Sequence, residues 1–141
     1  MTDTLDKASR SARMARIKSR NTRPELIVRK LIHAIGYRYR LHRRDLPGSP
    51  DLAFPGRRKA IFVHGCFWHR HADPACKLAR LPKSRLEFWL PKLEGNVRRD
   101  EAVQRALGES GWAVLVIWEC ELGDRVALES RIRSFLDDEV A

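Results

Sequence analysis

Hydrophobic residues recur at helical spacing in three stretches of this chain. The first begins at Thr22, which can cap a helix, and ends at Gly36. The second is expected over residues 92–107, following a proline, and the third over residues 124–136. The side chains expected to face the core are Leu26, Ile27, Leu31, Ile32 and Ile35 in the first stretch, Val97, Val103, Ala106 and Leu107 in the second, and Val126, Leu128, Ile132 and Phe135 in the third.

Four other stretches predict β-strands. Residues 37–42 alternate with one basic face, and residues 51–54 and 59–63 are short and mostly apolar. Residues 112–118 form the most apolar run of the chain, which is typical of a central strand. The order helix, strands, helix, strand, helix predicts a single α/β domain with a mixed sheet flanked by helices, without internal repeats or a second domain.

A predicted turn at residues 55–58 brings a carboxylate toward the chain's densest group of reactive side chains. If the strands on either side pair as a hairpin, Asp51 lies opposite Phe62 or Val63. Residues 64–71 read HGCFWHRH and contain three of the five histidines, one of the three cysteines and two large aromatic residues. Buried histidines and indoles need hydrogen-bond partners, so a plain core segment rarely has this composition. We interpret this stretch as the working centre of the protein.

The charge distribution favours a polyanionic partner. The 141 residues carry a formal net charge of +10, with 43% hydrophobic and 33% charged residues, which predicts a soluble globular protein. Seven basic residues and no acid lie between Lys7 and Arg23, and four more lie within residues 38–44. Such clusters favour nucleic acid, although simple solubility or nonspecific adhesion is the plain alternative. No apolar run is long enough to cross a membrane, so a cytoplasmic location and no membrane partner are expected.

One histidine and the three cysteines form a candidate zinc set. Cys66, His71 and Cys76 are separated by four residues each, and Cys120 follows the most apolar stretch. Three thiolates and an imidazole complete a tetrahedral structural zinc site, which would order a segment poor in apolar residues. The spacing does not match paired zinc-finger motifs, so three buried cysteines and a surface histidine remain the alternative.

A second set could support hydrolysis. Asp51 with a neighbouring backbone carbonyl suits Mg²⁺, which prefers oxygen ligands and keeps several waters. His69 could take a proton from water, His64 could give one to a leaving oxygen or orient a phosphate, and Glu25 could support the metal or a histidine. The alternatives are an Asp51 that caps a turn, a Glu25 that serves only a capping box, and histidines with structural hydrogen bonds.

Three aromatic residues lie in basic segments outside the expected helices and strands. Phe67 and Trp68 follow a histidine of the central stretch, and Trp89 lies in a second irregular segment. Exposed aromatic rings in a basic protein suggest stacking on bases or wedging between base pairs. Local packing over the candidate zinc segment is the alternative.

Together these motifs resemble the very-short-patch mismatch-repair DNA endonucleases. The resemblance covers roughly residues 6–136 and is most specific in the HGCFWH block. It implies a restriction-endonuclease-like fold and an enzyme that nicks one DNA strand 5′ to the thymine of a T:G mismatch left by deamination of 5-methylcytosine. The motifs that carry it are Pro50-Asp51, Phe62-Val63-His64-Gly65-Cys66-Phe67-Trp68-His69, Glu87-Phe88-Trp89-Leu90, Asn96-Val97 with Arg99-Asp100, Trp118-Glu119-Cys120, and the opening Asp6-Lys7-Ala8-Ser9-Arg10-Ser11 with Met14.

The resemblance also implies roles for individual residues. Asp51 would be the principal Mg²⁺ ligand with the backbone carbonyl of Val63 as a second, and His64, His69 and a supporting Glu25 would be catalytic. Structural zinc would be held by Cys66, His71, Cys76 and Cys120. The residues implied to contact DNA are Phe67, Trp68 and Trp89 beside the mismatch and, in a basic arm over residues 1–21, Lys7, Arg10, Arg13 and Arg16. Residues 22–141 would form the endonuclease domain, acting as a monomer on duplex DNA.

The sequence departs from the family pattern in three places. Val63 stands where a threonine is expected, which preserves a backbone ligand but removes a hydroxyl. The spacing between His71 and Cys76 is longer than expected, and Arg70 interrupts a run usually rich in histidine. Two other functions therefore remain open at this stage: a restriction-type endonuclease with another target, and a zinc-stapled DNA-binding module without catalysis.

Overall fold

A four-stranded mixed sheet organises the computed structural model, which describes residues 22–73, 75–81 and 83–138. The strands are β1 (Arg40–Leu41), β2 (Leu52–Phe54), β3 (Lys59–His64) and β4 (Ala113–Trp118). They lie in the order β1-β2-β3-β4, with antiparallel pairing from β1 to β3 and parallel pairing between β3 and β4. The predicted mixed α/β sheet in a single domain is confirmed. The predicted basic arm lies outside the described residues.

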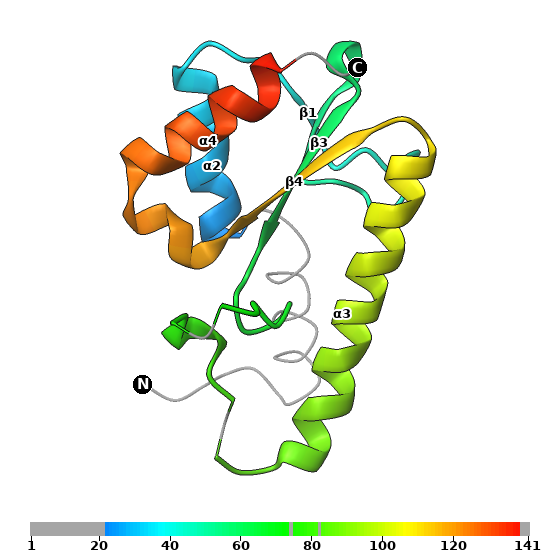
Figure 1. The fold of residues 1–141 in the computed structure, drawn as a ribbon, viewed down its shortest axis with the longest axis vertical. Helices are drawn as coiled ribbons and strands as arrows, with labels where there is room; N and C mark the ends of the chain where they lie inside the picture. Colours follow the sequence, from blue (N-terminus) through cyan, green and yellow to red (C-terminus); the bar gives the residue numbers. More distant parts are fainter. Residues whose placement is uncertain (1–21, 74, 82, 139–141) are drawn as a thin grey trace, which may run out of the picture.

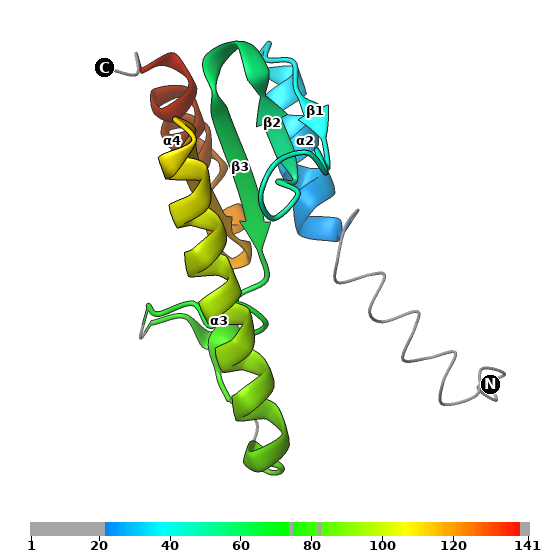
Figure 2. The same cartoon turned by 90° about the vertical axis from the view of Figure 1, so that its right-hand side faces the viewer.

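Three helices cover this sheet. Helices α2 (Arg23–Ala34) and α4 (Arg125–Asp137) lie on one side of it, and α3 (Leu86–Glu109) lies on the other (Figure 1). Both views show α3 running beyond the end of the strands to the lower end of the molecule (Figure 2). No helix in the described part of the chain is long and apolar enough to span a membrane. The main core lies between the sheet and the α2–α4 layer and includes Val28, Ile32, Leu52, Ile61, Ile117, Leu128 and Ile132.

The β2–β3 hairpin forms with the predicted geometry. Leu52 pairs with Ile61, which places Asp51 opposite Phe62 in the same register. The Val63 backbone N–H donates a hydrogen bond to Oδ2 of Asp51 at 2.7 Å. The loop between the strands is a short 3-10 helix (Pro55–Arg57), closed by Arg58 in the left-handed region at a φ of 54°. The hairpin therefore holds the Asp51 carboxyl at the end of the strands.

Several predicted boundaries were wrong, each for a local reason. The strand expected over residues 37–42 is limited to β1, because His42 has a φ of 47° and leaves the extended conformation. Helix α3 begins at Leu86 and includes Pro91, whose missing N–H affects only the solvent-exposed first turns. The predicted central position of the strand over residues 112–118 was also wrong. Strand β4 lies at the edge of the sheet, and its apolar composition reflects contact with helices.

The helix faces were predicted incompletely: Val28 in α2, for example, is fully buried although the sequence pattern did not select it. Val126 was expected to face the core, but its side chain is 81% exposed, and Leu136 is buried in α4 instead. In α3, Leu93 is fully buried although the sequence pattern did not select it. The helix expected over residues 92–107 included Leu93, but its inward face was assigned only from Val97 onward. The remaining predicted core positions are buried or half-buried, except Leu26, which is 40% exposed.

Candidate active site

A buried carboxyl group and a half-buried one meet at the end of the hairpin. Glu25 lies in the first turn of α2, where Thr22 caps the helix by accepting a hydrogen bond from the Glu25 N–H at 3.3 Å. Its side chain is almost completely buried, so it does more than complete a helix cap. The side-chain oxygens of Glu25 and Asp51 and a ring nitrogen of His42 all lie within 4.8 Å of one another. This group has the size and donor types of a divalent-cation site.

The electrostatics of Asp51 favour a cation at this position. Burial raises the pKa of Asp51 to about 8; the Val63 N–H opposes this rise, and the neighbouring Glu25 adds to it. Two adjacent buried carboxylates repel each other unless a proton or a cation lies between them. A divalent cation would compensate their charge, so these residues fit the metal that the family resemblance implies.

Two histidines form a second group. One of them, His64, directly follows Val63, whose N–H contacts Asp51. His64 ends β3, and His69 lies in the following loop, where its N–H donates to the Gly65 carbonyl at 3.1 Å. Their rings stack with centroids 3.8 Å apart and an interplanar angle of 8°. Nδ1 of His69 lies 2.6 Å from Oδ2 of Asp100 on α3, and Nε2 of His64 lies 4.0 Å from Oδ1 of the same side chain. Asp100 thus faces both rings.

The His64 ring is neutral at neutral pH. Burial lowers the pKa of His64 to about 4, the neighbouring His69 lowers it further, and Asp100 only partly opposes these effects. Its Nδ1 atom is buried and has no hydrogen-bond partner among the described residues. A neutral, buried imidazole donates a hydrogen bond at one ring nitrogen and accepts one at the other, which suits phosphate orientation; supplying a proton to a leaving oxygen would require the protonated ring.

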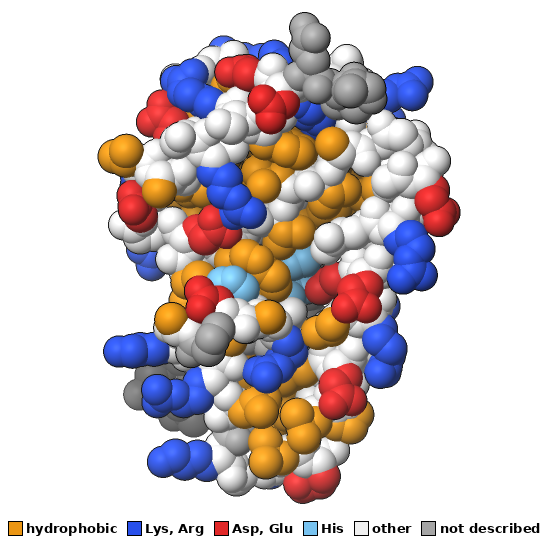
Figure 3. Space-filling view, in the orientation of Figure 1, with side chains coloured by type: hydrophobic (Ala, Val, Ile, Leu, Met, Phe, Trp, Pro, Cys, Tyr) orange, Lys and Arg blue, Asp and Glu red, His pale blue; other side chains and the backbone are white. Residues whose placement is uncertain are grey.

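A pocket opens beside the second group, next to the start of α2. Its volume is about 300 Å³, and it is lined by the start of α2, by Val63 and Gly65, and by Trp68, His69 and Glu119. The pocket therefore adjoins the strand residue that contacts Asp51 and the histidine that contacts Asp100. In the surface view, histidine side chains are visible between the sheet and the lower end of the molecule (Figure 3). This arrangement can hold a phosphate and a water between a cation site and an imidazole.

Sequence analysis missed two residues of this site. Asp100 was included in the motifs that carry the family resemblance, but no role was assigned to it. It reaches the histidines because α3 passes alongside the loop after β3, where Asn96 donates to the Trp68 carbonyl at 2.9 Å. His42 was expected only as the last residue of a strand. No local sequence signal marks either contact, because each depends on how separate elements pack.

The four predicted zinc ligands converge. The ligand atoms of Cys66, His71, Cys76 and Cys120 all lie within 4.8 Å of one another. The Cys120 N–H donates to Sγ of Cys66 at 3.4 Å, and Sγ of Cys120 lies 3.4 Å from Nδ1 of His71. The His71 ring also stacks on Trp118, with centroids 4.3 Å apart. Three sulfur atoms and one nitrogen at such separations match a tetrahedral zinc site, and no disulfide joins the cysteines.

Protonation differs among the three thiols. Burial raises the pKa of Cys66 to about 12 and also raises that of Cys120. At Cys76, hydrogen bonds with His71 and Cys66 outweigh burial and lower the pKa to about 7. Metal ligation requires thiolates, so a zinc ion would release the protons that burial keeps on Cys66 and Cys120. The donor set is compatible with zinc.

The predicted aromatic residues form one cluster at the start of α3. The rings of Phe67, Trp68 and Trp89 meet edge to face, with centroids 4.9 to 5.7 Å apart. Phe88 extends the cluster, is 46% exposed, and lies beneath the cations of Arg85 and Lys92. Hydrophobic side chains are exposed at this lower end of the molecule (Figure 3). The cluster therefore combines an apolar surface with neighbouring positive charge.

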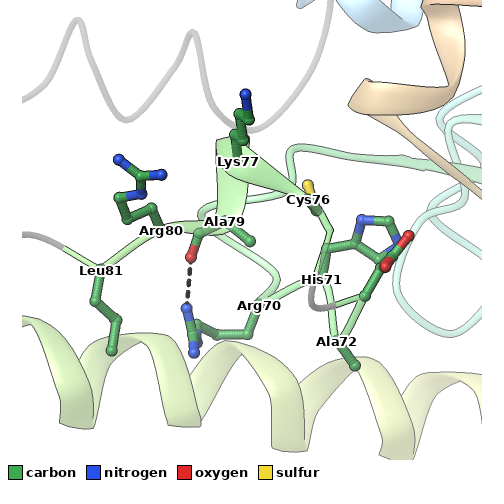
Figure 4. A pocket seen from close by; sticks show the side chains of 9 residues that line it. Arg70, His71, Ala72, Cys76, Lys77, Ala79, Arg80 and Leu81 are labelled. Carbon is green, nitrogen blue, oxygen red and sulfur yellow. Dashed lines mark hydrogen bonds between the residues drawn. The ribbon is translucent and has the colours of Figure 1, made fainter.

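A basic pocket lies beside the cysteine cluster. It has a volume of about 510 Å³ and lies between residues 70–73 and 76–81. The guanidinium of Arg70 donates to the Ala79 carbonyl at 2.7 Å, whereas Lys77 and Arg80 point away from α3 and Leu81 points toward it (Figure 4). Two cationic side chains thus project from the same short segment, which is typical of a surface that contacts phosphates.

Comparison with known proteins identifies the family. The family model for DNA mismatch endonuclease Vsr matches residues 2–75 of this chain, a span that includes Glu25, Asp51 and the two stacked histidines. The chain belongs to the Vsr family. As a Vsr-family protein it is a strand-nicking DNA endonuclease of mismatch repair, which confirms the family predicted from the sequence motifs. A module without catalysis is therefore not supported.

Individual Vsr relatives match most of the chain. The Type II nicking enzyme V.XorIIP of Xanthomonas oryzae pv. oryzae is 55% identical over 97% of this chain and 98% of its own length. DNA mismatch endonuclease Vsr of Escherichia coli is 43% identical over 91% of this chain and 80% of its own length. The Type II nicking enzyme V.NmeAIP of Neisseria meningitidis is 37% identical over 94% and 92%. The likeness thus extends beyond the matched family model into the C-terminal half of the chain.

Proposed function

We propose that this protein nicks one strand of duplex DNA 5′ to the thymine of a T:G mismatch, by Mg²⁺-dependent hydrolysis of a phosphodiester. The observation that carries the proposal is the position of two neighbouring residues on β3. The Val63 N–H contacts Asp51, and the next side chain, His64, stacks on His69. A cation site and a proton-transfer site are therefore one residue apart, a separation suited to a phosphate bound between them. The mixed sheet and its flanking helices are compatible with a restriction-endonuclease-like fold.

The carboxylate group is the proposed Mg²⁺ site. Asp51 would be the principal ligand and the Val63 backbone carbonyl a second, with Glu25 supporting the metal-bound water. When bound, Mg²⁺ would supply positive charge that polarises the scissile phosphate and offsets the charge that develops during hydrolysis. A threonine hydroxyl is not needed for this role, because the proposed ligand from residue 63 belongs to the backbone.

We assign the general base to His69. Its Nδ1 faces the Asp100 carboxylate at 2.6 Å, which fixes the proton on that nitrogen and leaves Nε2 free to accept one. Nε2 would take a proton from the attacking water as its oxygen bonds to phosphorus. The bond from phosphorus to the leaving oxygen then breaks, and that oxygen gains a proton. His64, neutral and buried, would orient the phosphate through a hydrogen bond, and a water molecule would supply this proton.

Zinc is proposed to hold the loop that carries His69. Cys66, His71 and Cys76 belong to that loop, and Cys120 follows β4. A closed tetrahedral site would fix the loop to the sheet, which apolar packing alone does not do in this segment. The metal is thus structural, and it positions the histidine without contacting the substrate.

The aromatic cluster is the proposed mismatch wedge. Insertion of Phe67, Trp68 and Trp89 beside the mispair would unstack and bend the duplex. A mismatched pair lowers the cost of that distortion, which gives selectivity without complete base readout. The basic pocket with Lys77 and Arg80 would contact a neighbouring phosphate. The arm over residues 1–21, with Lys7, Arg10, Arg13 and Arg16, would contact the backbone in the same way.

The test is strand nicking of a duplex with one T:G mismatch in a methylated-cytosine context, with and without Mg²⁺. The wild-type chain is compared with Asp51→Ala and with Asp45→Ala, a matched control because Asp45 is an exposed carboxylate paired with Arg43. The proposal expects a metal-dependent nick 5′ to the thymine that is lost only in Asp51→Ala. Equal cleavage of matched DNA would instead indicate a restriction-type endonuclease, and cleavage by Asp51→Ala would refute the proposed metal site.

A further inference from the structure

A histidine that the proposed reaction does not use lies against the buried carboxylate of Glu25. Nε2 of His42 lies 3.0 Å from one Glu25 oxygen and 3.2 Å from the other. A carboxylate accepts hydrogen bonds, so this geometry indicates that Nε2 carries a proton directed between the two oxygens. The His42 side chain is 16% exposed and that of Glu25 is 2% exposed, so the contact is largely shielded from water.

His42 also contacts the second carboxylate residue through its backbone. The His42 N–H donates to the Asp51 carbonyl at 3.4 Å, just beyond the pairing of β1 with β2. His42 has a φ of 47°, in the left-handed region that non-glycine residues rarely occupy. This backbone conformation turns the ring away from the line of the strand and toward α2. One residue therefore connects the start of α2 to the end of β2.

Glu25 is held from two sides. Nη1 of Arg29, one helical turn further along α2, donates to Oε2 of Glu25 at 3.1 Å, and His42 contacts both oxygens. Two buried carboxylates side by side repel each other, and Glu25 raises the pKa of Asp51. Hydrogen bonds from these donors lower the cost of keeping the charge of Glu25 next to Asp51. They also fix the direction in which its oxygens point.

We propose that His42 is a positioning residue for the metal site: it orients the Glu25 carboxylate toward Asp51 and thereby sets the affinity for the divalent cation. This inference rests on the proposed Mg²⁺ site. Residues that hydrogen-bond metal-supporting carboxylates control the orientation of those carboxylates, and their loss typically weakens metal affinity by about 10- to 100-fold. His42 acts through Glu25 and does not touch the substrate.

The test uses His42→Asn and His42→Gln. Asparagine tolerates a positive φ and so preserves the backbone, but its amide is too short to reach Glu25. Glutamine places an amide N–H near the position of Nε2 and can restore the contact. His33→Ala is the matched control, because His33 is an exposed histidine on α2. Mn²⁺ binding to the full chain without DNA is measured by calorimetry, and the Mg²⁺ dependence of nicking is measured separately.

We expect His42→Asn to weaken Mn²⁺ binding about 10-fold or more and to raise the half-saturating Mg²⁺ concentration, with the rate at saturating Mg²⁺ largely retained. His42→Gln and His33→Ala should stay within about twofold of the wild type. Wild-type Mn²⁺ affinity in a folded His42→Asn, alongside loss of binding in Asp51→Ala, would overturn the role of His42 alone. Unchanged binding in Asp51→Ala would overturn the proposed metal site itself.

Discussion

Asp100 on α3 contacts His69 in the loop after β3, with Oδ2 of the carboxylate 2.6 Å from Nδ1 of the ring. The two residues are 31 positions apart in the sequence and meet because α3 extends past the end of the sheet. The pair resembles the carboxylate–imidazole couples that hold a general base in one tautomer. Four predictions follow from this contact and from others in the structure.

Replacement of Asp100 by asparagine should reduce nicking by about 10²-fold or more, because an amide can donate to Nδ1 and so favour the wrong tautomer. Mn²⁺ binding should be unchanged, since Asp100 does not belong to the Asp51 group. The measurement is a single-turnover nicking rate with saturating Mg²⁺. The control is Glu101→Gln, a charge-neutralising change at the exposed next position of α3. A wild-type rate in Asp100→Asn would remove His69 from the role of base.

Loss of one cysteine ligand should loosen the loop that carries His69. We expect Cys120→Ser to lower the free energy of unfolding by about 2 kcal/mol or more and to increase amide hydrogen exchange in residues 65–81. The pairing of β2 with β3 should stay protected, because its contacts are hydrophobic and lie elsewhere. The rate of nicking should fall because the loop that carries His69 becomes less ordered, and added Mg²⁺ should not restore the rate. Unchanged exchange in both the variant and chelator-treated wild type would contradict a structural zinc site.

The Lys77–Arg80 surface can be tested through the salt dependence of DNA binding. Each lost phosphate contact reduces the slope of log affinity against log salt by about 0.9, so Lys77→Ala/Arg80→Ala should reduce it by about 1 to 2. The measurement is duplex binding between about 50 and 200 mM salt. Arg105→Ala/Arg133→Ala removes the same charge from exposed positions on α3 and α4 and serves as the control. Equal slopes in the two double variants would rule out a specific phosphate contact.

Tyr37 and Asp137 provide a pH-dependent link between the end of α2 and α4. The Tyr37 hydroxyl donates to Asp137, and this hydrogen bond is the main reason that the pKa of Tyr37 is raised. A raised folded-state pKa means that the contribution to stability is complete below pH 10 and is lost as pH rises through the folded pKa. Asp137→Asn should therefore lower the pKa of Tyr37 toward its ordinary value.

This last prediction is measured by absorbance titration of tyrosine in a Tyr39→Phe background, which leaves Tyr37 as the remaining tyrosine of the two in the chain. The stability difference between Asp137→Asn and the parent should diminish above pH 10, where the hydroxyl loses the proton that it donates. Identical titration midpoints in the two proteins would show that the hydrogen bond has no influence in solution.

The sequence predicted those parts of the site that depend on local geometry. The hairpin register placed Asp51 beside Val63 because pairing about a short turn leaves few alternatives. The four cysteine and histidine positions were selected by their chemistry, and the structure brings them together. Their metal, and the DNA contacts of Phe67, Trp68 and Trp89, stay predictions. The side chains that the family resemblance implies to be catalytic, Glu25, Asp51, His64 and His69, lie in the two groups described above, and their roles stay predictions.

The parts that were missed depend on packing between distant elements. Asp100 contacts His69 only because α3 passes beside the loop that follows β3. The helical periodicity of the sequence does not predict that packing. His42 owes its position to a positive φ that is unusual for histidine. Pro91 suggested a break, but α3 continues through it, and the proline removes one backbone hydrogen bond at an exposed position in the second turn. Val126 fitted an apolar face by spacing, but it is the second residue of α4 and is exposed, whereas Leu128 two positions later reaches the core.

The parallel pairing of β3 and β4 brings the ends of both strands to the same edge of the sheet, where His64 lies beside Trp118. His64, Asp51 and the four cysteine and histidine positions lie at this edge or in the segments that leave it, and Glu25 and Asp100 reach it from α2 and α3. The sheet and its main core thus form one part of the molecule, and the segments that carry the reactive side chains form another. A change in how β3 pairs with β4 would therefore displace His64 and Cys120 together, since His64 ends β3 and Cys120 follows the end of β4 at the same edge.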